Sequence, residues 1–183
     1  WVKKLKDKQV VAHGSDFGFT QDPTTLVSTI VDTQNKELWI YDEYYQRGML
    51  TDEIYQMYID KGLKNAEIVA DSAEKRLITE IKRKGISNIK PSVKGQGSIM
   101  QGVQFIQGFK IYVHPSCEHT IEELNTYTFD QDKDGNWLNK PIDENNHILD
   151  ALRYSLEKFH FPRNNKTNVN IKKNISRAKA MGL

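Results

Sequence analysis

Three aspartates and one histidine have the residue types and positions needed for phosphodiester chemistry with a divalent metal. Asp16 ends the first expected strand, and Asp71 directly follows a later one. Asp150 lies in the last expected helix, three residues after His147, so the two share a helix face. Mg²⁺ and Mn²⁺ prefer hard oxygen ligands and usually share coordination with water and substrate phosphate. Two such ions about 3.5–4 Å apart can stabilise the attacking and leaving oxygens of a phosphodiester.

Structural roles explain the same residues. Asp71 and Ser72 stand after an expected strand and just before an expected helix, where an aspartate commonly forms the turn or caps the helix. His147 and Asp150 lie opposite an apolar stripe formed by Ile148, Leu152, Ser155 and Phe159, as they would on a solvated helix face. Spacing alone therefore leaves both the metal-binding and the structural interpretation open.

The elements that must position these residues begin with three strands. Residues 10–16 alternate apolar with small or polar types, and residues 24–31 are rich in β-branched side chains. Residues 18–23 between them have turn chemistry, and residues 38–45 form a third, aromatic run. Such close spacing predicts an antiparallel meander.

Helices and strands then alternate. Helices are expected at 51–61, 73–84, 98–107, 118–126 and 146–159, and strands at 66–70, 86–93 and 110–114. This order predicts an α/β fold with a mixed β-sheet flanked by helices. In such sheets, functional residues gather where strands end in loops.

Two short segments match known motifs, but the residues around them exclude the kinase and calcium-binding functions that those motifs would indicate. Asp16-Phe17-Gly18 matches the kinase metal-binding tripeptide, but only 15 residues precede it and no His-Arg-Asp loop exists. The run 130–135 begins like a calcium-binding EF-hand loop, yet its twelfth position is Pro141 instead of a bidentate Glu. We instead expect a β-hairpin around Asp134-Gly135, with Tyr127, Phe129 and Trp137 on its arms.

Several basic residues are candidates for contact with a phosphate backbone. The candidates are Lys75, Arg76, Lys82, Arg83 and Lys94. Lys94 opens the segment Lys94-Gly95-Gln96-Gly97-Ser98, which could hold a phosphate at a helix start or be an ordinary glycine-rich turn. The other four lie on one expected helix, whose alternative interpretation is a solvated outer face. Cys117 is interpreted as a packing residue.

Composition limits the classes of protein further. The chain has 183 residues and a net charge of +2, from 26 Lys and Arg against 24 Asp and Glu. Residues 161–183 hold six basic residues and no acid, and the first ten hold four lysines against one aspartate. The body of the chain, residues 11–160, has the remaining 16 basic and 23 acidic residues and therefore a net charge of −7. We assign 1–160 to one domain and 161–183 to a basic C-terminal extension. We expect no membrane span and no secretion leader.

Segments containing the candidate acids resemble the C-terminal nuclease domain of tailed-phage terminase large subunits. The segments are His13-Gly14-Ser15-Asp16-Phe17-Gly18-Phe19, Val69-Ala70-Asp71-Ser72-Ala73 and His147-Ile148-Leu149-Asp150-Ala151-Leu152-Arg153-Tyr154. Residues 94–99, with Gly102 and Val103, are similar to a stretch between the second and third acids of that family. The segments occur in the family's order and span roughly residues 10–160.

The resemblance implies a ribonuclease-H-like fold and metal-dependent cleavage of concatemeric viral DNA during packaging, in the cytoplasm of the infected bacterial host. Asp16, Asp71 and Asp150 would hold two Mg²⁺ or Mn²⁺ ions. His147 matches a position in a subset of the family and would ligate metal weakly, orient water or assist proton transfer. The hairpin would lie over the DNA or gate access to the metals.

The implied partners are double-stranded DNA, an ATPase motor domain, the terminase small subunit and the portal. No G-x-x-x-x-G-K-[ST] motif occurs and the chain begins at Trp1, so we expect an excised nuclease domain. Two alternatives stay open: another ribonuclease-H-like nuclease of the resolvase or transposase type, and a non-catalytic module that docks to DNA or to the portal.

Overall fold

A computed structural model describes residues 10–142 and 144–160. The basic C-terminal extension and nearly all of the basic N-terminal segment lie outside the described residues. The first three strands are β1 (Val10–Asp16), β2 (Thr24–Asp32) and β3 (Glu37–Gln46), each antiparallel to the next. They form the predicted meander. No helix in the described ranges is both long and apolar enough to cross a membrane.

Shorter strands extend the meander on both sides into a mixed six-stranded sheet. They are β4 (Ile68–Ala70), β5 (Ile89–Pro91) and β6 (Lys110–Val113), and the sheet order is β5-β4-β1-β2-β3-β6. The contacts of β1 with β4, β4 with β5, and β3 with β6 are parallel. The fold class predicted from the sequence is therefore confirmed.

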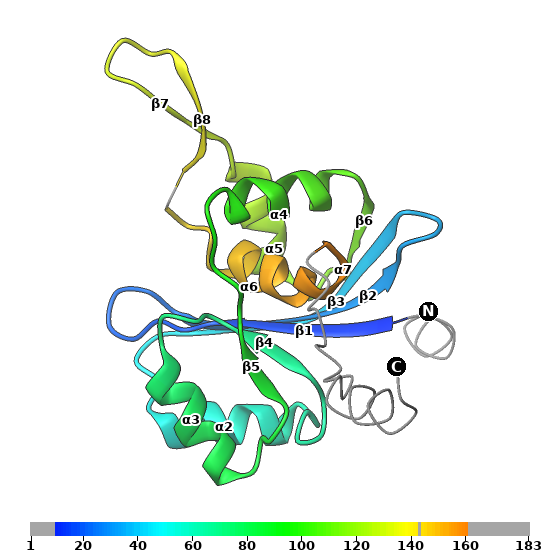
Figure 1. Cartoon of the computed structure of the whole chain (residues 1–183), viewed down its shortest axis with the longest axis vertical. Helices are drawn as coiled ribbons and strands as arrows, with labels where there is room; N and C mark the ends of the chain where they lie inside the picture. Colours follow the sequence, from blue (N-terminus) through cyan, green and yellow to red (C-terminus); the bar gives the residue numbers. More distant parts are fainter. Residues whose placement is uncertain (1–9, 143, 161–183) are drawn as a thin grey trace, which may run out of the picture.

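Helices cover both faces of this sheet (Figure 1). One face carries α2 (Thr51–Asp60) and α3 (Lys75–Lys84). The other carries α4 (Ser98–Gln107), α5 (Glu118–Thr126), α6 (His147–Ser155) and the short α7 (Glu157–His160). The last predicted helix is thus divided in two, and α3 begins two residues later than expected because residues 71–74 form a turn after β4.

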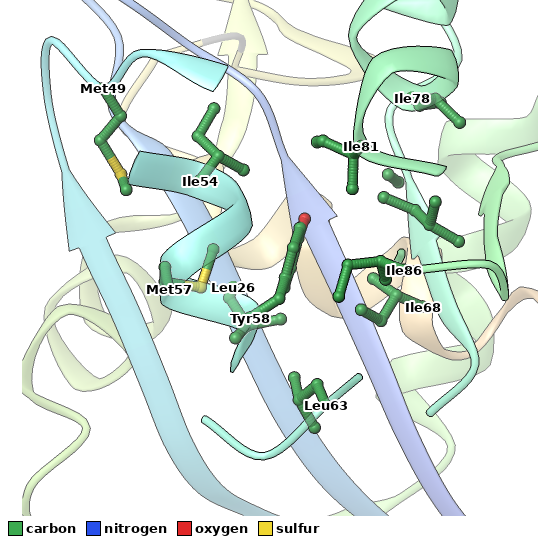
Figure 2. Packing of buried hydrophobic residues seen from close by; sticks show 12 residues of the cluster. Leu26, Met49, Ile54, Met57, Tyr58, Leu63, Ile68, Ile78, Ile81 and Ile86 are labelled. Carbon is green, nitrogen blue, oxygen red and sulfur yellow. The ribbon is translucent and has the colours of Figure 1, made fainter. Parts of the chain in front are cut away.

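Each face has its own hydrophobic core. Figure 2 shows the first, where the fully buried Tyr58 of α2 lies among apolar side chains from α2, α3 and the sheet. The second core joins Val27 and Leu38 of the sheet to Leu149 and Leu152 of α6. Cys117 is buried there, in agreement with its interpretation as a packing residue. The two cores hold the sheet between rigid helical layers, which fixes where its strands end.

The predicted hairpin is present outside the main sheet. It consists of β7 (Phe129–Gln131) and β8 (Trp137–Pro141), paired antiparallel, and it projects from the helical layer of α4 and α5 (Figure 1). Its tip is closed by Asp132, whose Oδ1 accepts hydrogen bonds from the backbone N–H groups of Asp134 and Asn136. Gly135 has φ +82°, a conformation that favours glycine.

Candidate metal centre

Asp16 and Asp71 meet because their strands are parallel neighbours. Ser15 of β1 pairs with Ala70 of β4, so the residue after each stands at the same edge of the sheet. The backbone N–H of Asp71 donates to the carbonyl of Ser15 over 3.0 Å, which continues the ladder to the first acid. Sheet topology therefore places the first two carboxylates side by side, as the strand-end argument predicts.

Helix α6 brings Asp150 and His147 to the same edge. Gly14 on β1 permits this approach, because a Cβ at this position would lie 1.9 Å from the carbonyl oxygen of Ala151. The hydroxyl of Thr25 on β2 donates to the carbonyl of His147 over 3.0 Å and fixes the first turn of the helix. A glycine and a threonine on two adjacent strands thus determine how closely the third acid approaches.

Each aspartate has a cationic or histidine partner from this chain. Lys94 Nζ lies 2.8 Å from Asp71 Oδ1, and Arg153 Nη2 lies 2.8 Å from Asp150 Oδ1. His147 Nδ1 lies 3.4 Å from Asp16 Oδ2. The aspartate side chains are only 12–22% exposed. Within the described part of the chain, these contacts gather on one oxygen of each carboxylate and leave the other oxygen for a ligand.

The three carboxylates also act on one another electrostatically. Burial raises the pKa of Asp16, and the negative charges of Asp150 and Asp71 raise it further, while the hydrogen bond with His147 lowers it. That hydrogen bond raises the pKa of His147, against the lowering effect of burial. His147 also approaches Asp22, with 3.5 Å between Nε2 and Oδ1. The edge of the sheet is therefore an acidic site with a histidine between two aspartates.

The donor set suits a hard divalent ion, although the side chains do not enclose one. Among residues 10–142 and 144–160, no group of three or more His, Cys, Asp or Glu side chains is arranged to hold one ion. Magnesium sites commonly use one or two carboxylates and complete their coordination with water and substrate phosphate. Three partly buried carboxylates, each with one open oxygen, match that incomplete kind of site.

A cavity of about 520 Å³ opens beside Asp150, the one candidate acid that lines it. It lies between the start of α4 and the base of the hairpin, and its lining includes Asp150 together with the basic residues Lys94, Lys140 and Arg153. Gly97 before α4 has φ +75°, so the glycine-rich segment is a turn at the helix start. Acidic and basic side chains thus line one cavity, which suits a phosphate backbone carrying a divalent counter-ion.

The comparison with known families shows the family to which this chain belongs. Residues 16–158 match the family model described as the terminase RNAseH like domain. The chain belongs to this family. Within the terminases, it is 32% identical over 154 residues to the PBSX phage terminase large subunit of Bacillus subtilis strain 168, covering 83% of this chain and 35% of that protein.

Other terminases give the same picture. The terminase large subunit of Bacillus phage SPP1 is 27% identical over 151 residues, covering 81% of this chain and 36% of the relative. This chain therefore spans about a third of the length of these curated terminases. The nuclease domain of the SPP1 large terminase, solved with bound Mn, matches with a TM-score of 0.79 at 24% identity, covering 86% of this chain and 90% of that one. The phage P22 large terminase nuclease domain matches with a TM-score of 0.60 at 19% identity, covering 84% and 81%.

Membership of the terminase family and the ribonuclease-H-like fold are thus confirmed, and the structure corrects two structural interpretations. Asp71 does not cap α3, but it does act as a turn former, since its Oδ1 accepts the backbone N–H of Ala73 over 3.1 Å in the turn before that helix. Asp150 and His147 do not lie on a fully solvated face, since their side chains are only 22% and 19% exposed and contact Arg153 and Asp16.

The candidate DNA-binding residues divide into two groups. Lys94 lies in the site, in contact with Asp71. The remaining four are exposed on α3, on the opposite face of the sheet from α6 (Figure 1). Of these, Arg76 lies 3.6 Å from Glu80 in an intrahelical ion pair, and Lys82 and Arg83 stand in the last turn, where cations stabilise the helix dipole.

Sequence reasoning missed three residues that shape the terminase site. Arg153 could have been found, because it follows Asp150 by three residues on the same helix. Gly14 gives no local signal, since its role depends on how α6 crosses β1. Glu123 was an ordinary residue of an expected helix, yet its carboxylate is buried and accepts hydrogen bonds from the backbone of α6.

Proposed function

We propose that this chain is the metal-dependent endonuclease domain of a phage terminase large subunit and cleaves double-stranded viral DNA during packaging. The observation that carries the proposal is the meeting of Asp16, Asp71 and Asp150, from two strand ends and one helix, at a single edge of a ribonuclease-H-like sheet. The Mn bound to the related SPP1 nuclease domain supports a divalent ion.

Asp16, Asp71 and Asp150 would hold two Mg²⁺ or Mn²⁺ ions through their open oxygens. When bound, two such ions supply an activated water and stabilise the leaving oxygen of the phosphodiester. The hydrogen bond of His147 with Asp16 orients that carboxylate, and the remaining imidazole nitrogen can hold a water or accept a proton. Burial of the acids limits solvent around the reacting phosphate.

The DNA backbone would lie along the cavity, where Lys94, Lys140 and Arg153 supply positive charge. Lys75, Arg76, Lys82 and Arg83 on α3 would contact a more distant part of the duplex, and the basic extension at 161–183 would add attraction beyond the domain at 1–160. The hairpin would cover the DNA or gate the cavity. The proposed partners are the ATPase motor domain of the full-length terminase, its small subunit and the portal, in the host cytoplasm.

A plasmid-cleavage assay tests the proposal. Cleavage is expected with Mn²⁺ or Mg²⁺ and not with EDTA, and Asp71→Asn should abolish it. Asp60→Asn is the matched control, because Asp60 is an exposed aspartate at the end of α2. Cleavage that persists in EDTA, or full activity of Asp71→Asn, would contradict the metal site. Cleavage confined to four-way junctions would favour a resolvase, and none with Mn²⁺ would favour a docking module.

Metal binding is measured separately by melting. Asp16→Asn should remove the stabilisation by Mn²⁺ that the unchanged protein shows. At an ion concentration of 100 times the dissociation constant, binding adds about 2.7 kcal/mol to the free energy of unfolding, or roughly 5–11 °C in Tm for a domain of this size. An equal shift in Asp16→Asn would remove that residue from the site.

A further inference from the structure

The first turn of α6 carries His147 and, one turn further, Asp150, so its placement decides the geometry of the site. Helix starts leave backbone N–H groups without partners inside the helix. The residue before α6, Asn146, makes no side-chain cap hydrogen bond. Some other group must therefore satisfy the amides of this buried turn.

Glu123 of α5 is that group. Its Oε1 accepts the backbone N–H of Ile148 over 3.1 Å, and its Oε2 accepts that of Leu149 over 2.9 Å. Both oxygens of one carboxylate are thus used by two consecutive amides of α6. The residue is 5% exposed, and its two oxygens satisfy buried amide donors that would otherwise be costly to leave without a partner. Glu123 acts as a cap supplied by a neighbouring helix.

Helix α5 is itself held to the sheet in the same manner. Glu43 on β3 accepts the backbone N–H groups of His119 and Thr120, each over 2.9 Å, and the hydroxyl of Thr120 over 2.6 Å. Two carboxylates therefore connect the sheet to α5 and α5 to α6. This chain of contacts reaches the first turn of α6, which Thr25 also contacts through the carbonyl of His147.

A structural role alone explains this arrangement poorly. A buried carboxylate is expensive, and an apolar residue would pack here at a lower free-energy cost if only the core mattered. The carboxylate instead fixes both the height and the rotation of the first turn of α6, because two amides in fixed directions must meet two oxygens. We propose that Glu123 is a positioning residue for the metal centre, setting His147 and Asp150 against Asp16. This inference rests on the proposed function.

The test is Mn²⁺ binding by titration calorimetry, well below the melting temperature, in Glu123→Gln. Glutamine keeps the shape but offers one acceptor, and its amide group would face a backbone N–H. We expect the dissociation constant for Mn²⁺ to rise by about 10–100-fold, the usual effect of losing a group that orients a ligand. Cleavage should return at raised Mn²⁺, which Asp16→Asn should not show. Glu122→Gln, on the exposed face of α5, is the matched control and should bind Mn²⁺ normally.

The outcomes separate the inference from the function on which it rests. If the unchanged protein binds no Mn²⁺, both the metal site and the positioning role are overturned. If it binds Mn²⁺ and Glu123→Gln binds it equally well, even with a lower Tm, only the positioning role is overturned. If Glu123→Gln does not fold, Glu123→Asp decides, because it keeps the charge but is too short to meet both amides. Unchanged Mn²⁺ affinity in that variant would likewise overturn the role.

Discussion

Replacing Gly14 by alanine is the sharpest test of how the sequence builds the site. The added Cβ would lie 1.9 Å from the carbonyl oxygen of Ala151, 2.7 Å from the backbone nitrogen of Ser155 and 2.9 Å from the carbonyl carbon of Ala151. All three atoms belong to the backbone of α6, so no side-chain rotation relieves the contact. Side-chain Cβ atoms are essentially never found below 3.0 Å from such atoms. Moving from 1.9 Å to 3.0 Å requires β1 and α6 to separate by about 1.1 Å.

That separation has two measurable consequences. Overpacking a core costs typically about 1–3 kcal/mol, and contact with backbone places Gly14→Ala at the upper end, near 3 kcal/mol. For a domain of this size the loss corresponds to a fall in Tm of roughly 6–12 °C. Asp16 lies two residues after Gly14, and Asp150 directly precedes Ala151, so the two acids move apart with the backbone. A misplacement of about 1 Å can reduce catalysis by about 100-fold.

The assays are thermal melting in EDTA, and Mn²⁺ titration at a temperature where both proteins are folded. Gly95→Ala is the stability control, because a Cβ there meets nothing within 4 Å and the residue has no positive φ. A fall in Tm of less than about 2 °C for Gly14→Ala, which corresponds to about 1 kcal/mol or less, would refute the packing argument. A lower Tm with unchanged Mn²⁺ affinity would refute the link between this contact and the site.

Three further predictions follow from individual contacts. Burial raises the pKa of Glu123 to about 7, from an ordinary 4.5, with the charge of Asp150 adding to the rise and its two amide hydrogen bonds and His147 opposing it. Between pH 4.5 and 7 the folded protein keeps a proton that the unfolded chain releases. The free energy of unfolding in EDTA should therefore decrease as the pH rises from 4.5 to 7. Urea titrations should show that the free energy of unfolding depends less on pH in Glu123→Gln than in the unchanged protein. An equal pH dependence in the two proteins would assign the effect to other titratable groups. Lys94→Met removes a cation from Asp71 and should tighten Mn²⁺ binding by up to about fivefold while weakening DNA binding; weaker Mn²⁺ binding would contradict the competition. Deleting residues 133–135 at the hairpin tip should change the cleavage rate more than Tm, and an unchanged rate would exclude a role over the DNA.

Local pattern predicted the elements of this fold well because their signals are local. Alternation marked β1, the turn chemistry at 18–23 marked its separation from β2, and Asp134-Gly135 marked the hairpin tip. Boundaries were less predictable: β5 covers only Ile89–Pro91 of the expected 86–93. Strand length there depends on pairing with β4, which itself has three residues.

The site was only partly accessible to the same reasoning. Two parallel strands that end in acids could be expected to bring Asp16 and Asp71 together, since the carboxyl ends of such strands share an edge. The position of α6 could not be inferred, because it depends on the missing Cβ of Gly14 and on a carboxylate from another helix. Glu123 lies inside a helix like any surface glutamate, and only tertiary packing distinguishes it from the exposed Glu122.

The ion pairs around the three aspartates bear on metal binding more directly than the net charge of the chain does. The body of the chain, residues 11–160, has a net charge of −7, which by itself would make the acidic site repel a phosphate backbone. Instead, Lys94 and Arg153 each lie 2.8 Å from one of the acids, so part of the charge is already compensated within the chain. The two cations differ in their freedom, because the Arg153 side chain is 10% exposed and packed against Gly102, whereas the Lys94 side chain is 56% exposed. A metal ion bound as proposed would therefore displace Lys94 from Asp71 more easily than Arg153 from Asp150. Arg153 would then still orient its carboxylate, and Lys94 would be available to a phosphate in the adjoining cavity.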